Sequence, residues 1–105
     1  MNYNLENKNI LITGASGGIG RSLCDKFINS KCNLICTSSN QDKLEQLKNT
    51  YGKHHSYYNL NFTDIESLQD SIQCIRKEHE NIDVIINNAG KTNDNVFLRM
   101  QQKQW

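Results

Sequence analysis

The stretch TGASGGIGRS, residues 13–22, follows directly on the apolar run NILI, residues 9–12. A glycine at such a point lets the backbone turn sharply out of a strand. Further glycines let the chain approach an anion and let the next helix pack closely on the sheet. That helix would present free amides and the positive end of its dipole. The stretch therefore predicts a phosphate-binding loop, although on this motif alone a glycine-rich turn without a ligand stays open.

Two phosphate-binding patterns compete for this stretch. A P-loop requires GxxxxGK followed by Ser or Thr, because the lysine reaches the terminal phosphates and the hydroxyl binds magnesium. Here Ala15 stands in place of the first glycine and Arg21 in place of the lysine. The alternative spacing, with glycines at positions 14, 18 and 20, suits the pyrophosphate of a dinucleotide. We therefore favour a dinucleotide over a nucleoside triphosphate.

Strand-like and helix-like segments alternate along the chain. Strands are predicted at residues 8–13, 33–37, 55–60 and 82–87. Helices are predicted at residues 18–30 and 41–48. A third helix is predicted to follow a capping box that begins at Thr63, and a fourth to begin near residue 94. Ser39 or Asn40 is expected to cap the second helix. The helix residues expected to face inward are Ile19, Leu23, Phe27, Leu44, Leu47, Ile65, Leu68, Ile72, Ile75, Val96, Phe97 and Met100. Four strands that alternate with helices predict a parallel α/β sheet.

Composition narrows the function classes. The chain has 105 residues, a formal net charge of +1 and a mean hydropathy of −0.71. Its mixed charges offer no basic face for nucleic acid, and no apolar run approaches the ~20 residues of a membrane span. The N-terminal residues do not resemble a signal peptide. The four cysteines lack the CxxC spacing of a metal site, so we expect buried thiols, no metal and a reducing, cytoplasm-like compartment.

A second motif, Asn87-Asn88-Ala89-Gly90, ends the fourth predicted strand. Sheets of this kind place their ligand-binding loops at that edge. Together with residues 13–20, it closely resembles the short-chain dehydrogenase/reductase family. The resemblance implies a Rossmann-type doubly wound parallel sheet, of which this chain is expected to hold four strands. Residues 1–105 would then be the dinucleotide-binding N-terminal part of one reductase domain, a fragment whose catalytic C-terminal part is absent.

Residues 88–100, with Trp105 after them, narrow the resemblance to the 3-oxoacyl-[acyl-carrier-protein] reductases, from which Lys91 and Asn93 are departures. The resemblance implies NADP(H)-dependent reduction of a 3-oxoacyl thioester in fatty-acid biosynthesis. It also implies an acyl carrier protein thioester as substrate, a homotetramer for the complete enzyme, and a cytoplasmic or organellar location. Two alternatives stay open: a non-catalytic dinucleotide-binding module, and a short-chain reductase of another small carbonyl compound.

The resemblance also implies residue roles. The loop at 14–20 would hold the pyrophosphate and its ribose, Ser39 would face the adenosine ribose, Asn61 and Phe62 would flank the adenine, and Asn88 to Gly90 would lie against the nicotinamide-side ribose. The implied cofactor-binding residues are Gly14, Ala15, Ser16, Gly17, Gly18, Ile19, Gly20, Ser39, Asn61, Phe62, Asn88, Ala89 and Gly90. Ser39 could instead be only a helix cap, and Asn61 only a loop residue.

The form of the cofactor follows from residues 37–40, Thr-Ser-Ser-Asn. NAD-selective relatives place a carboxylate there to accept a hydrogen bond from the ribose 2′-hydroxyl. No carboxylate is present here to repel a 2′-phosphate, so NADP(H) is favoured over NAD(H). Gly17 weakens this preference, since NADP-selective relatives often carry a basic residue at that position.

The catalytic residues of the family are not found in this sequence. The family uses a Tyr as general acid with its pKa lowered by a Lys, together with a Ser and an Asn. The pattern YxxxK does not occur, and Tyr57 and Tyr58 belong to a predicted strand on the adenine side. We therefore expect no catalytic residue in this chain, and no activity from the chain alone.

Overall fold

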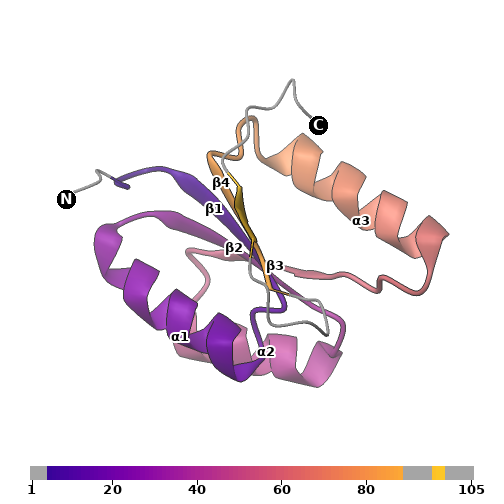
Figure 1. Ribbon diagram of the computed structural model, residues 1–105, viewed down its shortest axis with the longest axis horizontal. Helices are drawn as coiled ribbons and strands as arrows, with labels where there is room; N and C mark the ends of the chain where they lie inside the picture. The colour runs from indigo at the N-terminus through magenta and orange to yellow at the C-terminus, as the bar shows by residue number, and fades with distance from the viewer. Residues whose placement is uncertain (1–4, 89–95, 99–105) are drawn as a thin grey trace.

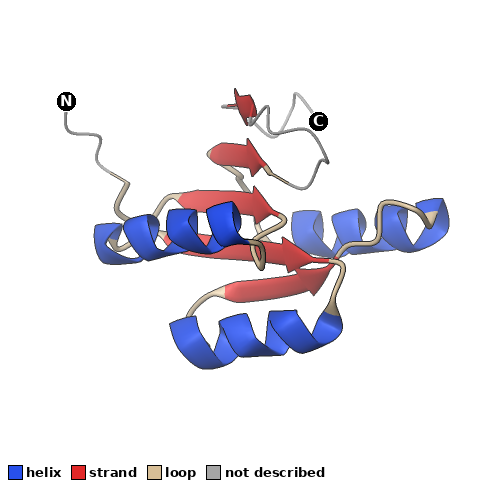
Figure 2. Cartoon of the chain, turned by 60° about the horizontal axis from the view of Figure 1, so that its bottom comes forward, coloured by secondary structure: helices blue, strands red, loops and turns tan. Residues whose placement is uncertain are grey.

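The computed structural model describes residues 5–88 and 96–98, which form one five-stranded sheet with helices on both faces. The strands lie in the order β3-β2-β1-β4-β5, and the first four are mutually parallel. Figure 2 shows their four arrows pointing the same way. The elements are β1 (Asn9–Thr13), α1 (Gly18–Phe27), the 3-10 turn η1 (Ile28–Ser30), β2 (Asn33–Ser38), α2 (Gln41–Tyr51), β3 (Ser56–Asn59), α3 (Ile65–Glu78), β4 (Val84–Asn87) and β5 (Val96–Leu98). The predicted parallel α/β architecture is confirmed.

Two hydrophobic cores lie on opposite faces of the sheet. Helices α1 and α2 cover one face and α3 covers the other (Figure 1). Successive residues of a strand point to opposite faces, so Ile10 and Ile12 join the first core while Leu11 joins the second. Because both faces are covered, β1 and β2 read as continuous apolar runs rather than as alternating ones.

Short polar side chains set where two helices begin. Asn40 caps α2, its side chain accepting a hydrogen bond from the Lys43 amide at 3.0 Å, which decides between the two candidate caps. The cap of α3 is Asp64, which accepts from the Ser67 amide, so the capping box predicted at Thr63 is one residue too early. Thr63 instead donates its hydroxyl to Asn61 at 2.6 Å. The helix therefore begins one residue later than the predicted box.

Three side chains that the sequence predicts to face inward or to be buried are exposed. Ile65 is 67% exposed, because it lies in the first turn of α3, outside the second core that Leu68 and Ile75 reach. Ile19 is 49% exposed at the first turn of α1, where the helix has just left the glycine loop. Cys74 is exposed on α3, whereas the other three cysteines are buried as expected.

The segment predicted to begin a fourth helix contains a strand instead. Residues Val96–Leu98 form β5, which pairs antiparallel with β4 and sets Phe97 opposite Ile86. Valine, phenylalanine and leucine suit a strand, and the free edge of β4 supplies the backbone partners that a local helical pattern does not. Met100 lies outside the described residues.

Among residues 5–88 and 96–98, no helix has the length and apolar character that crossing a membrane requires. Within the same residues, no group of three or more His, Cys, Asp or Glu side chains is arranged to hold a metal ion.

Candidate functional site

The glycine loop between β1 and α1 depends on two glycines for its shape. Gly14 has a φ of 63°, in the left-handed region that side chains disfavour, and this lets the chain leave β1 sharply. A Cβ built on Gly20 would lie 2.2 Å from the carbonyl oxygen of Gly14, inside backbone that cannot move aside. Gly20 is therefore the glycine that lets α1 pack against the loop.

Gly18 has a different environment from Gly20. A Cβ built on Gly18 meets no atom of residues 5–88 or 96–98 within 4 Å, so this glycine borders open space in the described part of the chain. It is the first residue of α1, whose N-cap, Gly17, makes no side-chain capping bond. The first amides of a helix have no acceptor inside the helix, and the first turn of α1 carries no acidic residue. This helix N-terminus therefore fits the phosphates of a dinucleotide, with room for them beside Gly18.

Hydrogen bonds join the loops at the carboxyl ends of neighbouring strands. The Ala15 amide donates to the Thr37 carbonyl at 2.9 Å, and the hydroxyls of Ser16 and Ser38 lie 2.8 Å apart. Beyond β2, the Leu60 amide donates to the Ser38 carbonyl at 3.0 Å. The loops after β1, β2 and β3 thus form one connected edge, as a dinucleotide that spans them would require.

The motif after β4 is tied to the same edge. The Asn88 amide donates to the Thr13 hydroxyl at 2.9 Å, and the Asn88 side chain donates to the Gly14 carbonyl at 3.3 Å. The Thr13 hydroxyl lies 2.9 Å from Oδ1 of Asn87, to which it donates. Asn88 therefore fixes the start of the glycine loop relative to β4. Sequence reasoning quoted Thr13 in the motif but gave it no role.

We expect Thr13→Val to lower the free energy of unfolding by about 1–3 kcal/mol, because it leaves the Asn88 amide without its acceptor in a partly buried position. Urea unfolding followed by circular dichroism measures the change. Thr50→Val is the matched control, since the Thr50 hydroxyl also bonds a carbonyl, that of Gln46, but on the exposed surface of α2. Equal effects of the two substitutions would contradict the role given to Thr13.

The remaining predicted site residues differ in their surroundings. Ser39 is exposed directly after β2, whereas Ser38 is buried and bonded to Ser16. Asn61 is exposed, and its side chain accepts from both the amide and the hydroxyl of Thr63. Phe62 is 52% exposed and so is not a core aromatic. Ala89 and Gly90 lie outside the described residues.

Ser38 is the residue that sequence reasoning missed. A serine directly at the end of the second strand was the available signal, but a hydroxyl there does not reveal whether it points inward or outward. In the structure its Oγ also accepts from the Asn40 amide at 3.1 Å. Ser38 therefore couples the glycine loop to the N-terminal cap of α2.

The described tyrosines lack the properties of a catalytic acid. Burial raises the pKa of Tyr51, Tyr57 and Tyr58, and the Glu78 carboxylate raises that of Tyr58 further. Tyr57 and Tyr58 line a pocket of about 520 Å³ at the amino end of β3, at the opposite edge of the sheet from the glycine loop. These directions are opposite to the lowered pKa that the family's chemistry implies.

A doubly wound sheet in the order 3-2-1-4, with a glycine-rich turn from β1 into α1, defines a Rossmann-type fold. Comparison with known sequences gives the family: a profile described as short chain dehydrogenase matches residues 8–105. The chain therefore belongs to the short-chain dehydrogenase/reductase family of oxidoreductases.

Three similar curated proteins carry the same name. The chain is 35% identical over 102 residues to the 3-oxoacyl-[acyl-carrier-protein] reductase FabG of Vibrio harveyi, and 33% identical to that of Escherichia coli strain K12. The corresponding protein of Buchnera aphidicola is 32% identical. Each alignment covers 97% of this chain and 42% of the relative. The chain thus spans about two fifths of the length of these relatives.

Proposed function

We propose that residues 1–105 are the dinucleotide-binding part of a short-chain reductase domain. The observation that carries this proposal is the open, uncapped N-terminus of α1 beside Gly18, held in place by the tight packing of Gly20 against Gly14. Such an arrangement suits the pyrophosphate of a nicotinamide dinucleotide. A non-catalytic module that binds the same ligand is the alternative, and it predicts binding without any contribution to turnover.

The proposed contacts follow the connected edge of the sheet. The loop from Gly14 to Gly20 would hold the pyrophosphate through the amides at the start of α1, with Ile19 exposed beside them. Ser39 would face the adenosine ribose, and the half-exposed ring of Phe62, next to Asn61, would lie against the adenine. Asn88, with Ala89 and Gly90, would lie against the second ribose.

We propose NADP(H) as the preferred form. Ser39 and Asn40 are exposed after β2, and residues 37–40 contain no carboxylate to repel a 2′-phosphate. We expect Ser39→Asp to reverse the preference, from about tenfold tighter binding of NADPH to tighter binding of NADH. The new charge repels the phosphate and accepts from the 2′-hydroxyl, and a tenfold change corresponds to about 1.4 kcal/mol.

Fluorescence titration with both reduced cofactors measures this preference. Ser30→Asp is the control: it adds the same charge in η1, before β2, at the opposite end of that strand. It should leave the ratio of the two dissociation constants unchanged. A parent chain that binds NADH more tightly than NADPH would contradict the assignment.

We further propose that the complete enzyme reduces a 3-oxoacyl thioester of acyl carrier protein, and that it does so as a homotetramer. Support comes from the name shared by the similar proteins and from alignment along 97% of this chain. Bound NADPH would supply the hydride. The residues described here would hold and orient the cofactor, and none of them is assigned a proton-transfer step.

The test joins this chain to the C-terminal segment of the Vibrio harveyi relative and follows NADPH oxidation. We expect turnover with an acetoacetyl thioester, little with free small ketones, and none from residues 1–105 alone. Preference for free ketones would favour a reductase of another carbonyl compound. Equal turnover by the short and the extended chain would show that the catalytic residues have been misplaced.

A further inference from the structure

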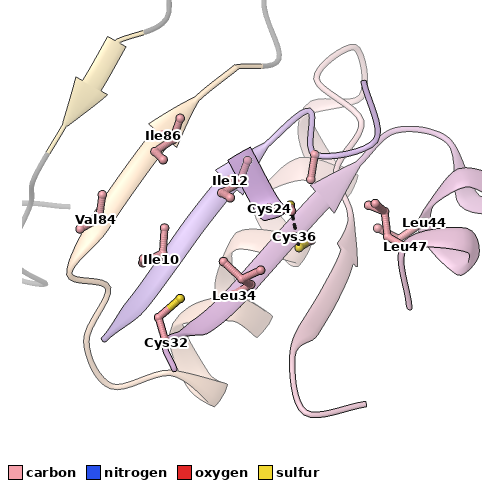
Figure 3. Packing of buried hydrophobic residues seen from close by; sticks show 11 residues of the cluster. Ile10, Ile12, Cys24, Cys32, Leu34, Cys36, Leu44, Leu47, Val84 and Ile86 are labelled. Carbon is pink, nitrogen blue, oxygen red and sulfur yellow. Dashed lines mark hydrogen bonds between the residues drawn. The ribbon is translucent and has the colours of Figure 1, made fainter. Parts of the chain in front are cut away.

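Two buried cysteines from different elements face each other in the first core. The sulfurs of Cys24 on α1 and Cys36 on β2 lie 3.9 Å apart, within hydrogen-bonding distance, and both side chains are fully buried (Figure 3). Cys32 lies at the other end of β2, and its thiol donates to the Phe27 carbonyl at 3.3 Å. The core therefore contains one close pair of sulfurs, with the third thiol held apart from it.

The two paired thiols are not equivalent. The hydrogen bond between the two sulfurs favours the thiolate of Cys24 and lowers the pKa of Cys24. The same bond and burial raise the pKa of Cys36, which keeps its proton. A thiolate is the form that attacks an oxidant, so Cys24 is the more nucleophilic of the two and Cys36 the resolving thiol.

We propose that Cys24 and Cys36 are a peroxide-oxidisable pair that forms a disulfide between α1 and β2. The Cys24 thiolate attacks one oxygen of hydrogen peroxide, the O–O bond breaks, and the hydroxide that leaves is protonated to water. Cys24 is then a sulfenic acid. The Cys36 sulfur attacks it, the S–O bond breaks, and a second water leaves with the Cys36 proton. In total, two thiols and one peroxide yield one disulfide and two waters.

Burial sets the conditions for this reaction. Peroxide reaches the pair when α1 opens locally from the sheet, so oxidation is slower than at the exposed Cys74. A disulfide holds its sulfurs about 2.05 Å apart, so the 3.9 Å separation must shrink by about 1.9 Å. Because the interior is close-packed, this movement is transmitted to α1 and β2, the two elements that shape the glycine loop.

The pair is close to the dinucleotide loop. Cys36 directly precedes Thr37, whose carbonyl accepts a hydrogen bond from the Ala15 amide. The next residue, Ser38, is hydrogen-bonded to Ser16. Cys24 lies in the helix whose N-terminus faces the open space at Gly18. Resting on the proposed function, we infer that the disulfide weakens NADPH binding about tenfold, within the range typical of coupled sites.

The experiment uses the 105-residue chain carrying Cys74→Ser, which removes the exposed thiol and with it disulfides between chains. The folded protein is treated with hydrogen peroxide, quenched in acid and alkylated in denaturant, and its mass is then measured by mass spectrometry. We expect loss of two hydrogen atoms and alkylation of a single thiol, both reversed by dithiothreitol. Trypsin leaves Cys32 and Cys36 in one peptide, residues 32–43, so fragmentation within that peptide identifies the partner of Cys24.

The variants separate the possible outcomes. Cys32→Ala should still form the disulfide, whereas Cys24→Ala and Cys36→Ala should not; circular dichroism checks that each is folded. Absence of the disulfide in the folded parent, or a link from Cys24 to Cys32, overturns the proposal.

A separate NADPH titration tests the effect of the disulfide on binding: a disulfide that leaves NADPH binding unchanged overturns the coupling. A reduced chain that does not bind NADPH instead contradicts the proposed function and leaves the mass result standing.

Discussion

Gly20→Ala is expected to lower the free energy of unfolding by about 3 kcal/mol, the upper part of the range for overpacked sites. The added Cβ would lie 2.2 Å from the Gly14 oxygen and within 3 Å of two backbone atoms of Ala15. No flexible side chain can rotate away, so either the loop or α1 must move. Against a typical total of ~5–15 kcal/mol this is a large loss, and NADPH binding should be lost with it.

Urea unfolding of the parent and the variant, followed by circular dichroism, measures this loss. Gly18→Ala is the matched control, because the same methyl group there meets no atom of the described chain within 4 Å. It should leave the stability unchanged or raise it slightly, since alanine favours a helix more than glycine does. If Gly20→Ala is as stable as Gly18→Ala, the close packing of α1 on the loop is wrong.

Gly18→Val is expected to weaken NADPH binding at least about a hundredfold while the chain stays folded. The branched side chain would fill the open space at the N-terminus of α1, where the pyrophosphate is proposed to lie. A hundredfold change corresponds to about 2.7 kcal/mol of binding free energy. Because a Cβ at this position meets no atom of the described residues within 4 Å, the substitution should not raise the cost of folding.

Fluorescence titration measures the affinity, and urea unfolding establishes that the variant is folded. Cys74→Ser, on the exposed face of α3, should bind NADPH as the parent does. Unchanged affinity in a folded Gly18→Val chain would show that the phosphates do not lie beside this residue. The two substitutions thus have different expected effects: Gly20→Ala lowers stability and binding together, whereas Gly18→Val weakens binding alone.

Local sequence signals predicted the helices and strands well where a single capping residue or a short apolar run decides the secondary structure. The apolar runs at β1 and β4 depend on burial of a whole strand, and the start of α2 depends on a polar cap, which the sequence narrowed to Ser39 or Asn40 and the structure assigns to Asn40. The cap of α3 was misplaced by one residue, because Thr63 and Asp64 are both acceptable caps and only the path of the chain after Asn61 distinguishes them. Residues 96–98 were misread because pairing with β4 outweighs a local helical pattern.

The sequence by itself determined that the chain is a parallel α/β protein with an anion-binding turn after its first strand, since glycine spacing and hydrophobic periodicity are local properties. The glycine spacing also predicted that Gly18 faces the anion and that Gly20 lets the helix pack, and tertiary structure supplied the distances: a Cβ on Gly20 would lie 2.2 Å from the Gly14 oxygen, whereas one on Gly18 meets no atom of the described residues within 4 Å. Tertiary structure alone decided that Ser38 points inward while Ser39 is exposed, and that Cys24 meets Cys36. Cys24 and Cys36 lie on different elements, and Ser38 and Ser39 differ in exposure at the end of β2, so the packing of the elements around the sheet decides both observations.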